Sequence, residues 1–379
     1  MSAPLGKLRP EQFLEQYWQK KPCLIRQAFP DFSPMLDEND LAGLACEEMA
    51  ESRLITGTYA AADWDVTHGP FSEQELAALG EQNWTLLVQD VEKHYAPLQK
   101  FLSLFSFIPN WRLDDLMISY AVAGGSVGPH VDQYDVFLLQ ASGRRRWQIA
   151  GSFEPELLSD CPLNVLKQFK VEQEWVLEAG DMLYLPPGLA HYGLELDAGM
   201  TWSVGSRAPS AADLLQGLGE WLAFLPDEGG RYSDPGLRPA ARAGEITAQA
   251  LDRLRGLMLT RINDIDDLNA YLAAFMSRFR LANEPAAPPE IISTAQVLAE
   301  ISDGAELMRN PWTRLVWIKT PTAACIFAAG QRYECSIDLA VFLCGHEHGH
   351  VDSGWLDQTS LACLTGLINN GHFLLVSSR

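Results

Sequence analysis

Residues 128–149 read GPHVDQYDVFLLQASGRRRWQI, and this segment is the most informative part of the chain. It opens with a His-x-Asp pair, His130 and Asp132, and continues into an apolar run. Alternate residues of a β-strand share a face and rise about 3.3 Å each, so a strand here would place both side chains on one face, roughly 7 Å apart at Cα. Val131 is apolar and would take the opposite face. The pattern predicts a strand that presents two metal-binding side chains.

A third potential ligand, His191, ends the segment GDMLYLPPGLAH at residues 180–191. A Gly-Asp turn begins this segment, an apolar strand follows, and Pro-Pro-Gly bends the chain back toward the first pair. Two imidazoles and one carboxylate are the ligands of non-haem Fe(II) oxygenases, which leave half of the metal's coordination positions open. The alternative is that the two histidines lie on the surface with ordinary hydrogen-bond partners. The β-rich surroundings favour a metal site instead.

Short apolar runs separated by Gly and Pro turns extend from Trp111 to Arg207, which predicts an all-β barrel or sandwich. Residues 1–110 mix short helical patterns with loops. A chain of 379 residues is long enough for two or three domains. The predicted strands are LMISYAV, VFLLQ, RRWQIA, WVLEAG, DMLYLP and TWSVG.

Helical periodicity returns after Pro209, first over residues 211–225 and then from about Glu245 to Leu281. NDIDD at 263–267 is expected to break the second stretch, with Asp or Asn capping the following piece. An apolar stripe on this stretch predicts either packing within the chain or a dimer surface. The stripe consists of Leu251, Leu254, Met258 and Ile262.

The proline-rich segment 283–290 is expected to be a linker. The helices and strands predicted beyond it suggest a small winged-helix-like domain. From Ala286 onward there are five Lys/Arg against nine Asp/Glu, the wrong sign for contacts with phosphates, so we expect no nucleic-acid binding. The expected domains are therefore an oxygenase domain at 1–208, a helical dimerisation region at 209–285 and a winged-helix-like domain at 286–379.

The formal net charge of −21 disfavours binding to nucleic acids and anionic membranes. It indicates either simple solubility or a basic protein partner. Seven scattered cysteines without a CxxC motif suggest reduced thiols. Neither a secretory signal nor an apolar run of membrane-spanning length is present, so a cytoplasmic location is expected.

HEHGH at 346–350 is a second histidine cluster, with Cys344 just before it. It could bind a soft metal. The pattern is not HExxH, and glycines bound the segment after an expected helix. We therefore expect a solvated loop.

The run FLLQASGRRRWQIA predicts a hairpin with its turn at residues 141–143. On the returning strand Arg145 would share a face with Trp147 and Ile149. An unpaired guanidinium among apolar groups is costly, so Arg145 needs an anion. A dicarboxylate co-substrate would supply one, and so would a carboxylate of the protein.

These segments, together with YWQKKPCLI at 17–25, resemble the JmjC-type 2-oxoglutarate oxygenases, specifically their ribosomal-oxygenase branch, over essentially the whole chain. The resemblance implies an α+β protein with a double-stranded β-helix (the cupin or JmjC jelly-roll barrel), a helical dimerisation region and a winged-helix domain. It implies that His130, Asp132 and His191 bind Fe(II) and that Arg145 binds 2-oxoglutarate, with O2 as the second co-substrate.

The resemblance further implies a homodimer that hydroxylates Cβ of one arginine in large-subunit ribosomal protein 16. Asp115 and Met117 lie in DDLMISY, Tyr134 in HVDQY and Ser203 in TWSVGSRAP. By the resemblance, Asp115 would hold the guanidinium, Met117 and Tyr134 would flank the methylenes, and Ser203 would add a hydrogen bond. Without the resemblance, the alternative is that Met117 and Tyr134 pack in the core and that Asp115 caps a turn. Two other functions stay open: an oxygenase acting on another protein residue or a small molecule, and a non-catalytic ribosome-associated binding module.

Overall fold

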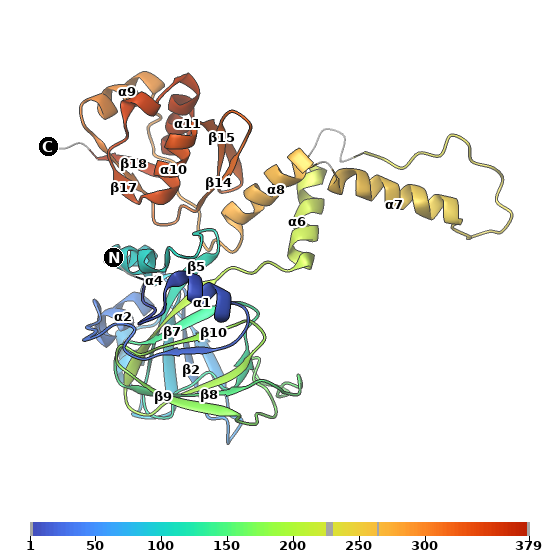
Figure 1. Ribbon diagram of the computed structural model, residues 1–379. Helices are drawn as coiled ribbons and strands as arrows, with labels where there is room; N and C mark the ends of the chain where they lie inside the picture. Colours follow the sequence, from blue (N-terminus) through green and yellow to red (C-terminus); the bar gives the residue numbers. More distant parts are fainter. Residues whose placement is uncertain (1–2, 225–229, 264, 377–379) are drawn as a thin grey trace. The chain divides into compact units, whose positions relative to one another are not determined.

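The computed structural model describes residues 3–224, 230–263 and 265–376 (Figure 1). The chain divides into two compact units, Met1–Ala208 and Pro209–Arg379. Each unit has its own hydrophobic core, so each is considered by itself.

Two antiparallel sheets form the first unit, as the β-rich pattern predicts. In spatial order, the larger sheet consists of β1 (Cys23–Ile25), β10 (Met182–Leu185), β7 (Val136–Gln140), β12 (Gly199–Ser206), β5 (Leu113–Ala121), β4 (Trp84–Val88), β2 (Ser52–Thr56) and β3 (Asp65–His68). The smaller sheet consists of β6 (His130–Val131), β11 (Ala190–Glu195), β8 (Arg144–Ala150) and β9 (Gln173–Glu178).

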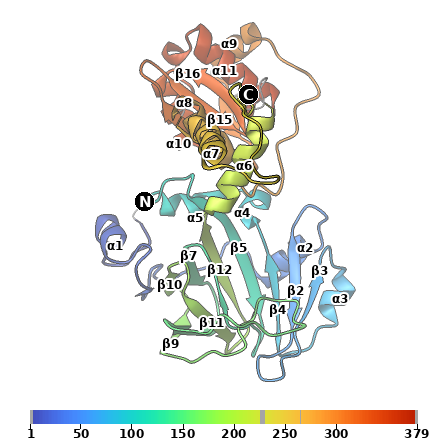
Figure 2. The ribbon, with the colours of Figure 1, turned by 90° about the vertical axis from the view of Figure 1, so that its right-hand side faces the viewer.

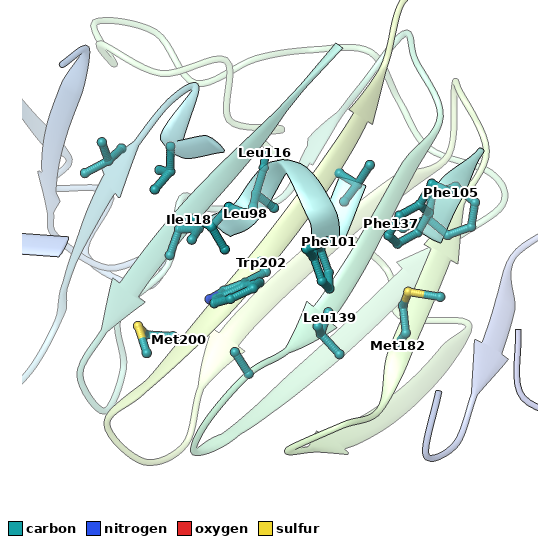
Figure 3. Packing of buried hydrophobic residues seen from close by; sticks show 14 of the residues in the cluster. Leu98, Phe101, Phe105, Leu116, Ile118, Phe137, Leu139, Met182, Met200 and Trp202 are labelled. Atoms are coloured by element: carbon teal, nitrogen blue, oxygen red, sulfur yellow. The ribbon is translucent and has the colours of Figure 1, made fainter. Parts of the chain in front are cut away.

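Helices cover one face of the larger sheet, because every second residue of its strands is apolar on that side (Figures 2 and 3). Trp202 is fully buried there and meets Phe101 of a covering helix edge to face, with ring centroids 5.1 Å apart. Leu116, Ile118 and Leu139 belong to the same cluster. The helical elements of this unit are α1 (Pro10–Gln16), α2 (Glu38–Ala45), α3 (Glu73–Ala77), α4 (Val91–His94), α5 (Pro97–Leu102) and the 3-10 turn η1 (Ser103–Phe105).

The opposite face of the larger sheet meets the smaller sheet, which closes a barrel. Leu138 and Leu183 of the larger sheet pack in one cluster with Trp147 and Ile149 of the smaller sheet. Inward-facing residues of both sheets therefore line a common interior, as in jelly-roll barrels.

Two expectations from the sequence are wrong. The first 110 residues contain four strands as well as helices, and three of these strands, β2 to β4, extend the larger sheet beyond β5. The predicted hairpin is also absent, because β7 pairs with β10 and β12 whereas β8 pairs with β9 and β11. Gly143, with φ +67°, turns the chain from one sheet to the other where a Cβ would lie 2.6 Å from the carbonyl oxygen of Ala198.

Three helices begin the second unit: α6 (Ala211–Ala223), α7 (Ala248–Ile262) and α8 (Ile265–Arg278). The predicted break between the last two is confirmed. The expected cap was an Asp or Asn within 263–267, and residue 264, which directly precedes α8, lies outside the described residues. α6 and α8 pack through Leu218, Tyr271 and Phe275. In contrast, Leu251, Leu254 and Met258 of α7 are 47%, 41% and 67% exposed.

The rest of the second unit is a helix-and-strand domain around a core that includes Leu307, Ile326 and Leu364. HEHGH is not a simple loop, because β17 lies within it and pairs with β13, although its three histidines are exposed. The elements are α9 (Thr294–Ser302), β13 (Glu306–Arg309), β14 (Leu315–Lys319), β15 (Ala324–Ala328), β16 (Gln331–Cys335), α10 (Ile337–Gly345), β17 (His348–Gly349), the 3-10 turn η2 (Ser353–Trp355), α11 (Gln358–Asn369) and β18 (Phe373–Val376).

Across the described ranges, no helix combines the length and the apolar character that a membrane span requires.

Candidate functional site

The structure brings His130, Asp132 and His191 together inside the barrel. His130 lies directly opposite His191 in the pairing of β6 with β11. The strand containing His130 ends at Val131, one residue earlier than expected, so Asp132 stands just beyond it. The backbone N–H of Gly188 donates to the carbonyl of Asp132 at 2.7 Å, which anchors the Pro-Pro-Gly bend against the His-x-Asp segment.

The three side chains share one centre. The Nε2 atoms of His130 and His191 lie 3.7 and 3.6 Å from Oδ2 of Asp132, and the two imidazole centroids are 4.2 Å apart. Their ligand atoms all lie within 4.8 Å of one another, a spacing that one ion can bridge with small adjustments. Within the described part of the chain, no other set of three His, Cys, Asp or Glu residues meets this criterion, and HEHGH does not.

Backbone carbonyls orient both imidazoles. Nδ1 of His130 lies 2.9 Å from the oxygen of Gly128, and Nδ1 of His191 lies 3.0 Å from the oxygen of Leu189. With Nδ1 occupied, each ring presents Nε2 to Asp132. Such outer partners are typical of metal-binding histidines, whose tautomer they fix.

The pKa values favour the ligand form at His191 and Asp132 but not at His130. Burial opposes protonation of His130, but the hydrogen bond and charge of Asp132 hold the pKa of that imidazole above its ordinary value, so a bound metal would have to displace its proton. Burial and the neighbouring His130 lower the pKa of His191 to about 4, so this imidazole is neutral near pH 7. Burial opposes ionisation of Asp132, but the hydrogen bond and charge of His130, together with a hydrogen bond from Tyr134, hold the pKa of that carboxyl below its ordinary value. A neutral imidazole and an ionised carboxylate are the ligand forms.

Arg145 lies on the same inward face of the smaller sheet, 4% exposed. It stacks over Trp147 with 4.9 Å between the guanidinium carbon and the ring centroid. Between Arg145 and His191 lies Gly193, where a Cβ would come within 2.7 Å of Nε of Arg145 and 2.8 Å of the Trp147 ring. The missing side chain therefore lets the guanidinium lie across β11 beside the histidines.

A protein carboxylate, one of the two anions expected for Arg145, is present. Nη1 of Arg145 lies 3.4 Å from Oε2 of Glu195, directly across the strand pair, and donates to Oγ1 of Thr201 at 3.1 Å. Nε of Arg145 and Nε1 of Trp147 are buried without a hydrogen-bond partner in the described structure. The guanidinium thus keeps capacity for a second acceptor.

Three of the residues expected to hold the substrate side chain lie on the inward face of the larger sheet, and the fourth, Tyr134, lies between β6 and β7. Met117 is paired with Ser203 across β5 and β12. Asp115 lies on the same face of the sheet as Met117 and Ser203, and its Oδ1 would be 3.2 Å from a Cβ built on Gly205. Tyr134 packs against the cluster that contains Leu138 and Trp147, as well as donating to Asp132.

Asp115 lies among other acidic groups. Burial, followed by the charges of Asp114 and Asp90, raises the pKa of Asp115 to about 7, against the lowering effect of Lys93. Arg207 forms a 3.0 Å ion pair with Asp114. Arg207 also responds to the charge of Asp115, so this carboxyl group lies near both carboxylates and buried cations.

The sequence did not predict the polar partners of Arg145, which are Glu195 and Thr201, or Gln140, which bonds to both. Glu195 has the same strand parity as His191, and Thr201 has the same parity as Ser203, so alternation places both inside the barrel. This alternation was the available signal, but it could not reveal which strands would be neighbours.

Together, the barrel and the His-Asp-His group define a JmjC-type oxygenase fold with a metal-binding site. A model of the JmjC domain family matches residues 100–214, and a model of the ROXA-like winged helix matches residues 260–373. The chain belongs to the JmjC-type ribosomal oxygenase family.

Particular relatives support this assignment. The chain is 34% identical over 372 residues to the ribosomal protein uL16 3-hydroxylase of Escherichia coli, covering 95% of this chain and 96% of that protein. It is 33% identical to a probable ribosomal oxygenase of Haemophilus influenzae, covering 86% and 82%. The X-ray structure of E. coli YcfD superposes with a TM-score of 0.88 at 33% identity, covering 99% of this chain and 100% of that one.

Proposed function

We propose that this enzyme is an Fe(II)- and 2-oxoglutarate-dependent hydroxylase that acts on Cβ of an arginine in large-subunit ribosomal protein 16 (uL16). The observation that carries the proposal is the His130–Asp132–His191 group beside the buried Arg145. Two further facts support it: the similarity to the E. coli uL16 3-hydroxylase, and the E. coli YcfD structure with cobalt and 2-oxoglutarate, which has a TM-score of 0.83 and 33% identity.

The donor set fits Fe(II). Nε2 of His130, Nε2 of His191 and a carboxylate oxygen of Asp132 would hold the ion on one side and leave the other side open. When bound, the metal would supply oxygen activation coupled to oxidative decarboxylation of 2-oxoglutarate. The carbonyls of Gly128 and Leu189 would keep both imidazoles in the required tautomer.

Arg145 would bind the distal carboxylate of 2-oxoglutarate. Its guanidinium lies near the histidines because Gly193 leaves space, and its Nε has no partner in the described structure. A charge-assisted hydrogen bond from this buried group would orient the co-substrate in the barrel.

Asp115 would hold the guanidinium of the substrate arginine, with Met117 and Tyr134 along its methylenes and Ser203 as a further hydrogen-bond partner. Support comes from the shared inward face of Asp115, Met117 and Ser203. The role of these residues is to aim Cβ at the metal and to exclude water from the reaction.

A homodimer formed through the exposed stripe of α7 is part of the proposal. Three large apolar side chains on one helix, each at least 41% exposed, are costly in water and suit a second copy. The domain boundary at 285/286, a cytoplasmic location and the absence of nucleic-acid binding stay predictions.

Mass spectrometry tests the proposed activity. The Fe(II)-loaded enzyme is incubated with recombinant uL16, 2-oxoglutarate and O2, and peptides are sequenced by fragmentation. We expect one added oxygen atom on Cβ of a single arginine, no addition with His130→Ala, and undiminished addition with the exposed-loop control His346→Ala. Oxygen on a different residue type would favour an oxygenase of another specificity, and unmodified uL16 together with no succinate formation would favour a binding module.

A further inference from the structure

Glu195 and Arg145 are connected by buried polar side chains. Nε2 of Gln140 donates to Oε1 of Glu195 at 2.9 Å. Oγ1 of Thr201 donates to Oε1 of Gln140 at 3.0 Å and accepts from Nη1 of Arg145 at 3.1 Å. Gln140 and Thr201 therefore link the carboxylate to the guanidinium by hydrogen bonds with defined directions.

One oxygen of Glu195 is not satisfied by this network. Oε2 lies 3.4 Å from Nη1 of Arg145 and is buried without a hydrogen bond in the described structure. Glu195 is 1% exposed, and its Oε1 is held by Gln140. The carboxyl group is therefore enclosed in the barrel beside the guanidinium.

Binding of a dicarboxylate at Arg145 would place two carboxylates beside one buried cation. Other charges do not balance the excess. Asp197 and Tyr120 are the further titratable groups that act on or respond to Glu195, and Asp197 is already paired with Arg144 at 2.6 Å. The two positive charges of the proposed Fe(II) would be offset by Asp132 and by the 2-oxo acid end of the co-substrate. An uncompensated buried charge is costly, and the group that can gain a proton does so instead.

We propose, on the basis of the proposed function, that Glu195 is a positioning residue that takes up one proton from solvent when 2-oxoglutarate binds. The protonated Oε2 then donates a hydrogen bond to the distal carboxylate of the co-substrate, while Arg145 provides the charge. Glu195 thereby makes the affinity for the co-substrate depend on pH.

The direction of this dependence follows from linkage. In the unliganded enzyme, burial raises the pKa of Glu195 to about 7, against the lowering effects of Arg145 and Gln140. A second carboxylate at Arg145 raises this pKa further. Affinity is therefore constant below about pH 7 and falls by up to about tenfold per pH unit above it, where binding requires a proton from solvent.

Isothermal titration calorimetry tests the proposal without turnover. Enzyme loaded with Mn(II) is titrated with 2-oxoglutarate at about pH 6, 7 and 8 in buffers of different ionisation enthalpy, which gives the number of protons taken up. We expect about one proton at pH 8 for the unmodified protein. Glu195→Gln should take up none and keep its low-pH affinity throughout, and the exposed control Glu174→Gln should behave as the unmodified protein.

Three results would overturn the inference. These are uptake of no proton by the unmodified protein at pH 8, an unchanged pH dependence in Glu195→Gln, and an equal loss of pH dependence in Glu174→Gln. The proton count of the unmodified protein decides the question even if Glu195→Gln does not fold. If the Mn(II)-loaded protein bound no 2-oxoglutarate at any pH, the proposed function itself would fail, which is a distinguishable outcome.

Discussion

At the scale of single residues, the absence of a side chain at Gly193 leaves the space that Arg145 and Trp147 occupy. Gly193→Ala would introduce a Cβ within 2.7 Å of Arg145 Nε and 2.8 Å of Trp147. We expect the guanidinium to be displaced, the KM for 2-oxoglutarate to rise at least about tenfold, and stability to fall by about 1–3 kcal/mol. Steady-state kinetics and thermal unfolding measure both effects.

Gly43→Ala is the matched control, because nothing lies within 4 Å of a Cβ at that position. An unchanged KM in Gly193→Ala would show that Arg145 does not depend on this space.

Asp115 gives a pH dependence of the opposite sign to that of Glu195. Burial and the charges of Asp114 and Asp90 raise the pKa of Asp115 to about 7, so ionisation, and with it attraction for an arginine guanidinium, increases as pH rises through 7. With 2-oxoglutarate saturating, the KM for an arginine peptide should fall several-fold between about pH 6 and pH 8. Asp115→Asn should raise KM and remove this dependence; a variant that retained the full pH profile would exclude Asp115 from the arginine pocket.

Short patterns in the sequence predicted which side chains would meet in the candidate metal site. His-x-Asp and the Pro-Pro-Gly bend indicated three side chains that do meet, because their spacing along the chain reflects strand geometry. Glu195 and Thr201 escaped notice because their importance comes from contacts across strands with Arg145, and such contacts depend on which strands are neighbours.

At the scale of elements, α7 exposes apolar residues that a second copy of the chain would cover in the proposed dimer. The double substitution Leu254→Glu with Met258→Glu adds two negative charges to the stripe. We expect a dimeric protein to become monomeric in light scattering, because the interface would have to bury both charges.

Arg255→Glu changes the net charge equally and serves as the control, since Arg255 pairs with Asp252 on the surface of α7. A protein that is monomeric at micromolar concentration without any substitution would contradict the role of α7.

The elements also show which structural features could be predicted from the sequence and which could not. The apolar runs of the barrel strands and the periodic helices were located correctly, since alternation and 3.6-residue spacing are local signals. The hairpin at residues 141–143 was wrong because a three-residue turn can join neighbours in one sheet or cross between two sheets. Packing of Gly143 against Ala198 and Gly199 decides between these options, and this contact is not local in the sequence.

At the scale of the whole molecule, the net charge of −21 should attract a basic ribosomal protein. Raising the salt concentration from about 50 mM to about 300 mM shortens the range of this attraction and should lower kcat/KM for intact uL16 about tenfold. A short peptide that contains the target arginine but carries no net charge is the control, with little change expected. Equal salt sensitivity of both substrates would mean that the surface charge has no part in substrate capture.

The central claim is that His130, Asp132 and His191 bind one Fe(II) beside Arg145 and that 2-oxoglutarate chelates this metal. Anaerobic titration of the Fe(II)-loaded protein with 2-oxoglutarate tests it most directly, because chelation by a 2-oxo acid produces a charge-transfer absorption in the visible range. We expect this band at one equivalent of iron, its loss in His191→Ala, and its appearance only at much higher 2-oxoglutarate concentration in Arg145→Ala. A band of full intensity in His191→Ala, or no band in the unmodified protein, would exclude these three residues as the iron ligands.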